Sequence, residues 1–409
     1  FMEVKQIYNE NKNNLLFSRN AKIKKLREKI LKKITKDYLN KKNNESIKNV
    51  DLNLLNSLDY KYKKIKVLNS IKINNQNNYE LNIVNGFLEN FNNDKIKINP
   101  VNDDDSNILF NDISFPKDDY IVDLNSLLTN SGYKLLIKKN QKVLLDIKNT
   151  FPDENFTIFQ KNFIKCEEGS DLKIIDNYLN NSSSFHNIII NIELENNAKF
   201  EHIIIQKNSE FDNLFLTTQA DCYKNTEYNQ TTFNFSNGFV RNHHYGNLCD
   251  TGSVVNHNGV FFLKDMNKAD NKTYVRHLSE SCKSDQIYKG VLDGKSKATY
   301  YSNTFVEKNA QKTEGYQLSK GIILSDEATF FSKPELRIYA DDVKCSHGST
   351  IGPIDEQLIY YIRSRGINKK EATKILIKSF INDNFEKLSN CLIQKKIEVY
   401  IDDYLNHIN

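Results

Sequence analysis

The sequence of 409 residues contains no tryptophan and only five prolines, and no apolar run approaches the ~18 residues of a membrane-spanning helix. Its first residues also lack the charged-then-apolar pattern of a secretory signal. The 57 basic and 52 acidic residues nearly cancel, whereas a nucleic-acid-binding domain is usually strongly basic. These absences predict a cytoplasmic protein with neither a membrane nor a nucleic-acid partner.

Cysteine is sparse and scattered, with six thiols at positions 166, 222, 249, 282, 345 and 391. None of them belongs to a Cys-x-x-Cys pair, so the spacing does not support a structural zinc site. Without an export signal we expect reduced thiols, most of them ordinary buried side chains.

The N-terminal part of the chain is basic and polar. Residues 20–40 fit an amphipathic helix, in which apolar side chains recur near the helical period between lysines. The lysines could contact an anionic partner or form an ordinary solvated face. Residues 41–115 are rich in asparagine with short apolar groups, and we interpret them as linking strands and loops. The three aspartates at 103–105 fit a turn because later calcium ligands are absent. We assign residues 1–117 to an N-terminal helical and irregular region.

Strand-like segments rich in Ile, Val, Phe, Tyr and Thr follow one another from about residue 118 to 345. A weak repeat, in which a small residue and a variable position precede an aromatic one, ends at Phe200, Tyr228, Tyr300 and Phe330. These aromatic residues are 28, 72 and 30 positions apart, which suits the rungs of a solenoid. A β-sandwich remains the alternative. The predicted strand-rich domain comprises residues 118–353.

The chain beyond Pro353 returns to helical patterns. Asp355 can cap a first helix, and Gly366 lies where a left-handed residue would end it. The apolar positions of this helix are Leu358, Ile359, Tyr361 and Ile362. Two further helical patterns follow, the last around residues 386–404. We therefore predict a helical C-terminal domain over residues 354–409.

The densest group of chemically active side chains lies within residues 339–350. Cys345 and His347 are two positions apart, so on a strand they would project to the same face. Thiolate sulfur and imidazole nitrogen suit iron or zinc. Two ligands cannot complete a tetrahedral site, so another subunit would have to supply the rest. The alternative is a turn-stabilising Ser-His-Gly end to the last rung.

Three other groups allow weaker functional interpretations. Asp341 and Asp342 suggest a β-helix polysaccharide hydrolase, but adjacent carboxylates on a strand point to opposite faces and make a poor acid–base pair. Residues 290–296 resemble a phosphate-binding loop that is one residue too short, and we interpret them as a turn between rungs. A last group suggests a metal cluster but is interpreted as surface turns: His243, His244, Cys249 and His257.

Several short segments occur in an order that resembles a known family. They are residues 289–293, 310–313 with Gln317, 324–325 with Ala328, 333–336, 338–352, Leu358, Tyr361, 363–366 and Ala372. Together they are similar to the SufB/SufD family of SUF iron–sulfur cluster assembly proteins, and the resemblance covers residues 270–385. Residues 340–348, His277 and Ser284 resemble the SufD branch more than the SufB branch. The lack of tryptophan departs from the SufD-like N-terminal pattern.

This resemblance implies a right-handed parallel β-helix flanked by helical regions, acting as a non-catalytic scaffold. It implies pairing with SufB through the ends of the β-helix, and binding of the ATPase SufC by the C-terminal helices. The candidate SufC contacts are Leu358, Tyr361, Ile362, Arg363 and Arg365. A homodimer through the same β-helix edge is an expectation for the isolated chain.

The resemblance also places His347, with Cys345 as a weaker candidate, at the SufB interface where a transient iron–sulfur cluster forms. It implies no cofactor held stably by the isolated chain, and it is compatible with reduced flavin in the complex. The alternatives are a SufB-type scaffold, a β-helix carbohydrate-active enzyme and an adhesin-like solenoid.

Overall fold

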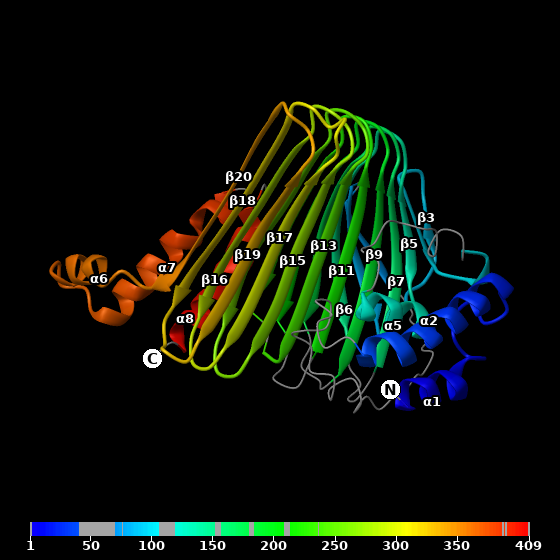
Figure 1. Ribbon diagram of the computed structural model, residues 1–409, viewed down its shortest axis with the longest axis horizontal. Coiled ribbons are helices and arrows are strands. Elements are labelled where there is room, and N and C mark those ends of the chain that lie inside the picture. The colour runs from blue at the N-terminus through cyan, green and yellow to red at the C-terminus, as the bar shows by residue number, and fades with distance from the viewer. Residues whose placement is uncertain are drawn as a thin grey trace.

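The computed structural model describes residues 2–40, 70–75, 77–105, 119–151, 157–179, 184–207, 213–235, 237–386, 388 and 391–407. Most of these residues form two long sheets, with helices near both ends of the chain (Figure 1). None of the helices in these ranges is long and apolar enough to cross a membrane.

Within the described ranges, each sheet contains ten strands. Sheet A consists, in spatial order, of β1 (Ile71–Asn75), β2 (Asn78–Val84), β6 (Lys142–Thr150), β8 (Asp171–Leu179), β10 (Lys199–Lys207), β12 (Glu227–Asn234), β14 (Val254–Leu263), β16 (Lys283–Leu292), β18 (Thr313–Ile323) and β20 (Val343–Pro353). Sheet B consists of β19 (Thr329–Ile338), β17 (Lys297–Val306), β15 (Lys268–His277), β13 (Phe239–Leu248), β11 (Asn213–Cys222), β9 (Phe185–Leu194), β7 (Thr157–Cys166), β5 (Tyr133–Ile137), β4 (Ile96–Pro100) and β3 (Phe91–Asn92).

The chain passes from one sheet to the other at every strand from β5 onward. From β6 to β18, each strand pairs in parallel with the strand of the turn before it and with that of the turn after it. Only β1–β2, β3–β4 and β4–β5 are antiparallel among the described strands. The predicted parallel β-helix is therefore confirmed, and the sandwich alternative is wrong. Strands β1–β4, over residues 71–100, join the sheets ahead of the boundary predicted at residue 118.

The sequence repeat predicted part of the register. Phe200 and Tyr228 are direct partners on β10 and β12, so their separation of 28 residues is one turn. Tyr300 instead pairs with Ser332, so the alignment of Tyr300 with Phe330 is wrong by two positions. Tyr228 and Tyr300 also lie in different sheets, which means that their separation is not a whole number of turns.

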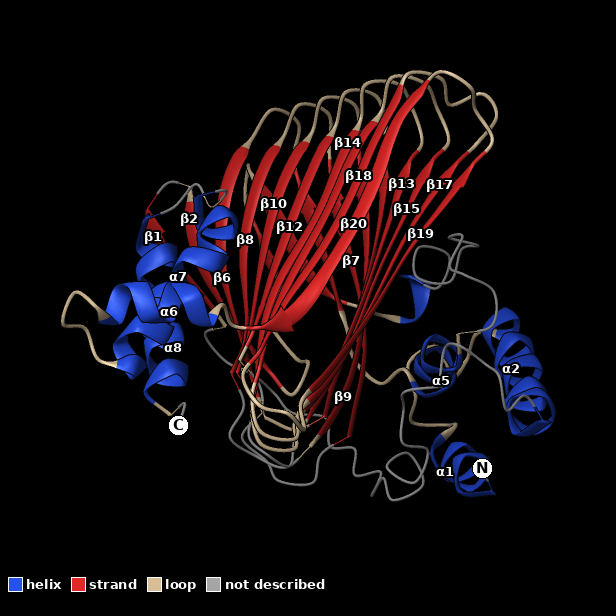
Figure 2. Ribbon diagram, turned by 60° about the vertical axis from the view of Figure 1, so that its left-hand side comes forward, coloured by secondary structure: helices blue, strands red, loops and turns tan. Residues whose placement is uncertain are grey.

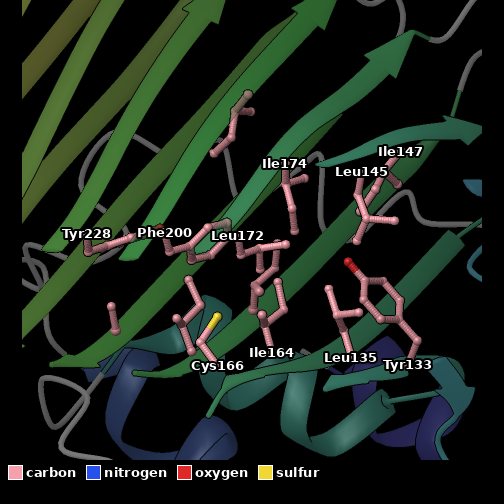
Figure 3. Packing of buried hydrophobic residues seen from close by; sticks show 14 of the residues in the cluster. Tyr133, Leu135, Leu145, Ile147, Ile164, Cys166, Leu172, Ile174, Phe200 and Tyr228 are labelled. Atoms are coloured by element: carbon pink, nitrogen blue, oxygen red, sulfur yellow. The ribbon is translucent and has the colours of Figure 1, made fainter. Parts of the chain in front are cut away.

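The interior is apolar near the start of the β-helix. Figure 3 shows Tyr133 and Leu135 of sheet B facing Leu145 and Ile147 of sheet A. Alternate positions of each strand point inward and are buried, and a fully buried Leu or Ile contributes about 1.5–3 kcal/mol. Further along the β-helix the inward positions become polar, as Gln286 on β16 illustrates.

The N-terminal helices cover the outer face of sheet B. They are α1 (Met2–Asn11), α2 (Ala21–Asn40) and α5 (Tyr120–Leu128), with the short 3₁₀ turn η1 (Asp103–Asp105) between them in sequence. Helix α2 confirms the amphipathic helix predicted at 20–40. Its buried Ile30 and Ile34 pack with Leu124 of α5 against Phe159 and Phe185 of the sheet. Predicted segments at 41–69 and 106–115 lie outside the described residues.

The C-terminal helices cover the outer face of sheet A, on the opposite side of the β-helix (Figure 2). They are α6 (Glu356–Arg363), α7 (Lys369–Glu386) and α8 (Cys391–Asn406). Ile377 of α7 and Ile397 of α8 are fully buried against Ile203 and Phe233 of the sheet. Helix α6 contacts α7 and lies farther out, away from the strands (Figure 1).

Candidate site at the open end of the β-helix

The last turn of the β-helix leaves two sheet edges uncovered. Among the described strands, β19 pairs only with β17 and β20 pairs only with β18, so each has one row of unpaired backbone groups. We call these two edges the open end. Two large aromatic side chains are also exposed here: Phe331 on β19, at 54%, and Tyr339 directly after this strand, at 61%. Such an edge is a template for another strand.

Both predicted ligands lie on the edge strand β20. His347 is the direct partner of Gln317, and Cys345 is the direct partner of Gly315, so both share the inward face of the sheet. His347 is exposed, because no further turn covers it. Cys345 is half-buried, and burial raises the pKa of its thiol. It packs with Val306, Ala310, Ala340 and Val343. A protonated thiol in apolar surroundings is a poor ligand, so the accessible imidazole is the better candidate.

The site is incomplete within this chain. Among the described residues, no three His, Cys, Asp or Glu side chains come together in a way that could hold a metal ion. A cluster or metal at His347 would therefore need donors from outside these residues. The roles of His347 and Cys345 stay predictions.

A column of polar side chains, which the sequence reasoning missed, leads through the interior to His347. Its members lie in register on successive strands of sheet A: His202, Gln230, His257, Gln286 and Gln317. We call these five residues the polar column, and His347 continues it by one turn. The recurrence of His or Gln every 27 to 31 residues is the signal that would have revealed it.

Hydrogen bonds join the polar column to sheet B across the interior. Thr218 donates to Gln230 Oε1 at 3.2 Å, and the Nε2 of Gln230 lies 2.8 Å from His244 Nδ1. Two turns beyond the Thr218–Gln230 pair, Thr273 donates to Gln286 Oε1 at 2.6 Å. Three turns beyond it, Ser302 donates to Gln317 Oε1 at 3.1 Å. These bonds satisfy buried polar groups, which would otherwise cost about 1–3 kcal/mol each.

The histidines interpreted as surface turns are buried instead. His243 and His244 lie on β13 and diverge, the first towards the outer face and the second towards the interior. His243 Nε2 lies 3.3 Å from Asp270 Oδ2, while the rings of His244 and His257 are 6.0 Å apart. Burial lowers the pKa of His257 to about 3. The interpretation was wrong because helices and neighbouring strands cover both faces of this strand.

Two other sequence motifs have structural roles. Asp341 and Asp342 are exposed in the turn before β20, not on a strand, and the carbonyl of Asp342 accepts the Lys312 N–H at 2.6 Å. Gly290 lies within β16, where a Cβ would approach the Phe261 ring to 2.4 Å. Gly294, with φ of +64°, forms the predicted turn between rungs. Neither motif provides a catalytic pair or a phosphate site.

The predicted partner contacts lie on α6 and, for Arg365, in the turn that follows it. Leu358 and Tyr361 are exposed, Ile362 is half-buried, and Arg363 and Arg365 are exposed. The Arg365 guanidinium stacks 3.8 Å above the Tyr361 ring. Sequence reasoning missed Tyr360, whose side chain is 75% exposed.

The lysine of the predicted 289–293 segment joins α7 to the β-helix. The buried ammonium of Lys289 donates to the Phe380 carbonyl at 2.6 Å and to Asp383 at 2.9 Å. This contact fixes α7 on the outer face of sheet A, so a structural need explains why that motif contains a lysine.

Comparisons with known proteins identify relatives of this chain. The family described as SUF system FeS cluster assembly, SufBD core domain, matches residues 149–380. The chain is 26% identical over 273 residues to the iron-sulfur cluster assembly protein SufD of Escherichia coli, covering 65% of this chain and 64% of that protein. It is 27% identical over 213 residues to an iron-sulfur cluster assembly SufBD family protein of Synechocystis, covering 52% and 47%. It is 26% identical over 249 residues to protein ABCI7, chloroplastic, of Arabidopsis thaliana, covering 59% and 52%. The chain thus spans less than two thirds of each relative.

Proposed function

Because this chain belongs to the SufB/SufD family of SUF iron–sulfur cluster assembly proteins, we propose that it is the SufD-type scaffold subunit of a SUF complex. The main support is the extent of the family match, which runs from the end of β6 into α7 and so includes the open end. In this role the chain provides surfaces and a ligand for assembly, while ATP hydrolysis belongs to a partner.

The open end is the proposed contact with SufB. Pairing a partner strand with β19 or β20 would satisfy the unpaired backbone groups and continue the sheet. The partner would also cover Phe331 and Tyr339, and buried aromatic side chains are typical anchors of protein interfaces.

His347 is the proposed ligand at this interface, where the iron–sulfur cluster is cargo rather than a resident cofactor. A neutral imidazole nitrogen suits iron, and the exposed position of His347 on β20 leaves it accessible to donors of the partner chain. The incomplete ligand set of this chain fits a site shared between two subunits.

Replacing His347 with alanine should abolish its proposed role as a ligand of the cluster. In a complex reconstituted with SufB and SufC, H347A should lower iron and acid-labile sulfide to the level of a complex that has not been loaded. Lys344→Ala is the matched control, since Lys344 is exposed on the same strand but points to the other face. Normal cluster content in an intact H347A complex would contradict the ligand role.

Helix α6 is the proposed contact with SufC. Replacing Leu358 and Tyr361 together with alanine should weaken SufC binding roughly 30-fold or more, because losing an interface anchor costs about 2 kcal/mol or more. Val399→Ala on α8, whose side chain is 65% exposed, is the control. Isothermal titration with purified SufC would measure the change, and an unaltered affinity would reject α6 as the contact. Deleting residues 354–409 is a poorer test, because α7 and α8 cover apolar side chains of sheet A.

A further inference from the structure

A histidine that binds a metal through one ring nitrogen almost always donates the N–H of its other nitrogen to an acceptor. That hydrogen bond fixes the ring orientation and selects the nitrogen left free for the metal. In the described residues no hydrogen bond reaches the imidazole of His347, which is exposed on the last strand. The inference below rests on the proposed function, because it concerns how this imidazole is oriented.

Gln317 is the neighbour of His347 whose acceptor has a fixed direction. Three inward residues of β18 lie beside the His347 region, namely Gly315, Gln317 and Ser319. Gly315 has no side chain, and the Ser319 hydroxyl can rotate. Gln317, by contrast, is only 3% exposed and is the direct partner of His347, whose strand runs about 5 Å away.

The hydrogen bonds of Gln317 distinguish the oxygen of its side-chain amide from the nitrogen. Its Nε2 lies 3.1 Å from the carbonyl oxygen of Glu335 and 2.7 Å from Thr304 Oγ1. A carbonyl oxygen can only accept, so the NH₂ group must face Glu335 and the amide cannot be flipped. Its Oε1 accepts one hydrogen bond, from Ser302, and keeps a second lone pair.

The neighbouring member of the polar column shows the same arrangement, although no hydrogen bond joins it to Gln317 directly. Gln286, one turn further inside, donates to the same Thr304 hydroxyl at 2.7 Å and accepts from Thr273 at 2.6 Å. Both amides are thus held from the side of sheet B. A rigid amide is a suitable support for a ligand that must be held in one geometry.

We propose that Gln317 is a positioning residue for His347. Its Oε1 accepts the N–H of one ring nitrogen of His347 and leaves the other ring nitrogen directed to the open end for iron or a cluster precursor. The bonds of Gln317 to Ser302, Thr304 and Glu335 give this acceptor its direction, which explains why a buried glutamine belongs to the motif around residues 310–317.

The test compares three variants of the full chain. Q317M keeps the length of the side chain but removes the acceptor, Q317E keeps an acceptor and adds a negative charge, and Q286M makes the same change one turn further inside. Histidine side-chain NMR, with H347A identifying the His347 signals, gives its tautomer ratio and pKa. We expect one dominant tautomer in the wild type and in Q286M, and a mixture in Q317M. Q317E should keep the tautomer and raise the pKa of His347, because a nearby carboxylate favours the charged imidazole.

A second readout uses ferrous iron as the probe, added anaerobically to the complex with SufB and SufC. Q317M should weaken iron binding by about 10- to 100-fold, and Q317E should recover part of it. The inference is overturned if Q317M leaves the tautomer ratio unchanged, or if Q286M alters it equally. If the tautomer changes as expected but H347A leaves iron binding and cluster content normal, the positioning role holds and the proposed ligand function fails. Q317E keeps the test decisive if Q317M does not fold.

Discussion

Replacing Arg241 with methionine should lower the free energy of unfolding by about 3–5 kcal/mol, because it would leave a buried carboxylate without its cation. Arg241 is fully buried on the outer face of β13, and its Nη2 lies 2.6 Å from Asp119 Oδ2. Asp119 also caps α5, where its other oxygen accepts the N–H of Ile121 at 2.9 Å. This ion pair therefore joins the start of α5 to β13, in addition to the apolar packing of the N-terminal helices on sheet B.

The charge state of Asp119 explains the size of this effect. Burial by itself raises the pKa of Asp119, but the Arg241 charge and the hydrogen bond from His243 outweigh it and hold the pKa well below the usual range. The pKa of Asp119 is lower in the folded chain than in the unfolded chain, where it is near 4. Ionised Asp119 therefore stabilises the fold above about pH 4, and this contribution is lost as the pH falls towards its folded-state pKa. The difference between wild type and R241M should therefore be largest near neutral pH and shrink in acid.

Chemical denaturation at pH 7 would measure the change. Arg337→Met is the matched control, because Arg337 is exposed and its bond to Glu335 should be worth about 1 kcal/mol or less. Adding Asp119→Asn to R241M should restore part of the stability, since asparagine can still cap α5 without a charge. A loss in R241M no larger than in R337M would show that the buried pair is not what holds the helices.

The sequence predicts the β-helix better than its ends. The inward alternation and the aromatic repeat are local patterns, so they identify strands wherever stacking buries one face, as on β10 and β12. Strands β1–β4 were expected only as linking strands and loops without bounds, because short asparagine-rich segments have low intrinsic strand propensity. Ile71–Asn75 becomes a strand only because β2 pairs with it, and β2 in turn pairs with β6. That tertiary pairing leaves no local pattern.

The candidate site could also be predicted only in part, because some of its features depend on tertiary pairing. A strand containing Cys345 and His347 could be predicted from two-residue spacing, but the difference between a half-buried thiol and an exposed imidazole depends on which turn is last. The polar column was missed because turns of unequal length separate its members by 27 to 31 residues, so the recurrence of His and Gln has no fixed period. For the same reason His257 was taken for a surface residue, although it lies at the centre of the column.

The buried histidines predict how the fold responds to acid. His257 is fully buried between the rings of Tyr228, at 5.8 Å, and His244, at 6.0 Å, and burial lowers its pKa to about 3. Burial also lowers the pKa of His277 to about 3. The unfolded chain binds these protons near pH 6.5, whereas the folded chain does not bind them until about pH 3. Stability is thus fully present above pH 6.5 and falls by about 1.4 kcal/mol per pH unit for each histidine between these values.

Replacing His257 with glutamine should remove one of the side chains that bind a proton in the unfolded chain but not in the folded chain. Glutamine matches Gln230 and Gln286, the in-register neighbours on either side, so the variant fits the polar column. Between pH 7 and pH 5, H257Q should lose about 2 kcal/mol less stability than the wild type, measured by urea denaturation at both pH values. His407→Gln, at an exposed position of the C-terminal helices, should change nothing. An acid response of H257Q equal to that of the wild type would mean that the interior already admits a charged imidazole. The polar column would then be a hydrated path through the β-helix instead of a dry set of hydrogen bonds that fixes its register.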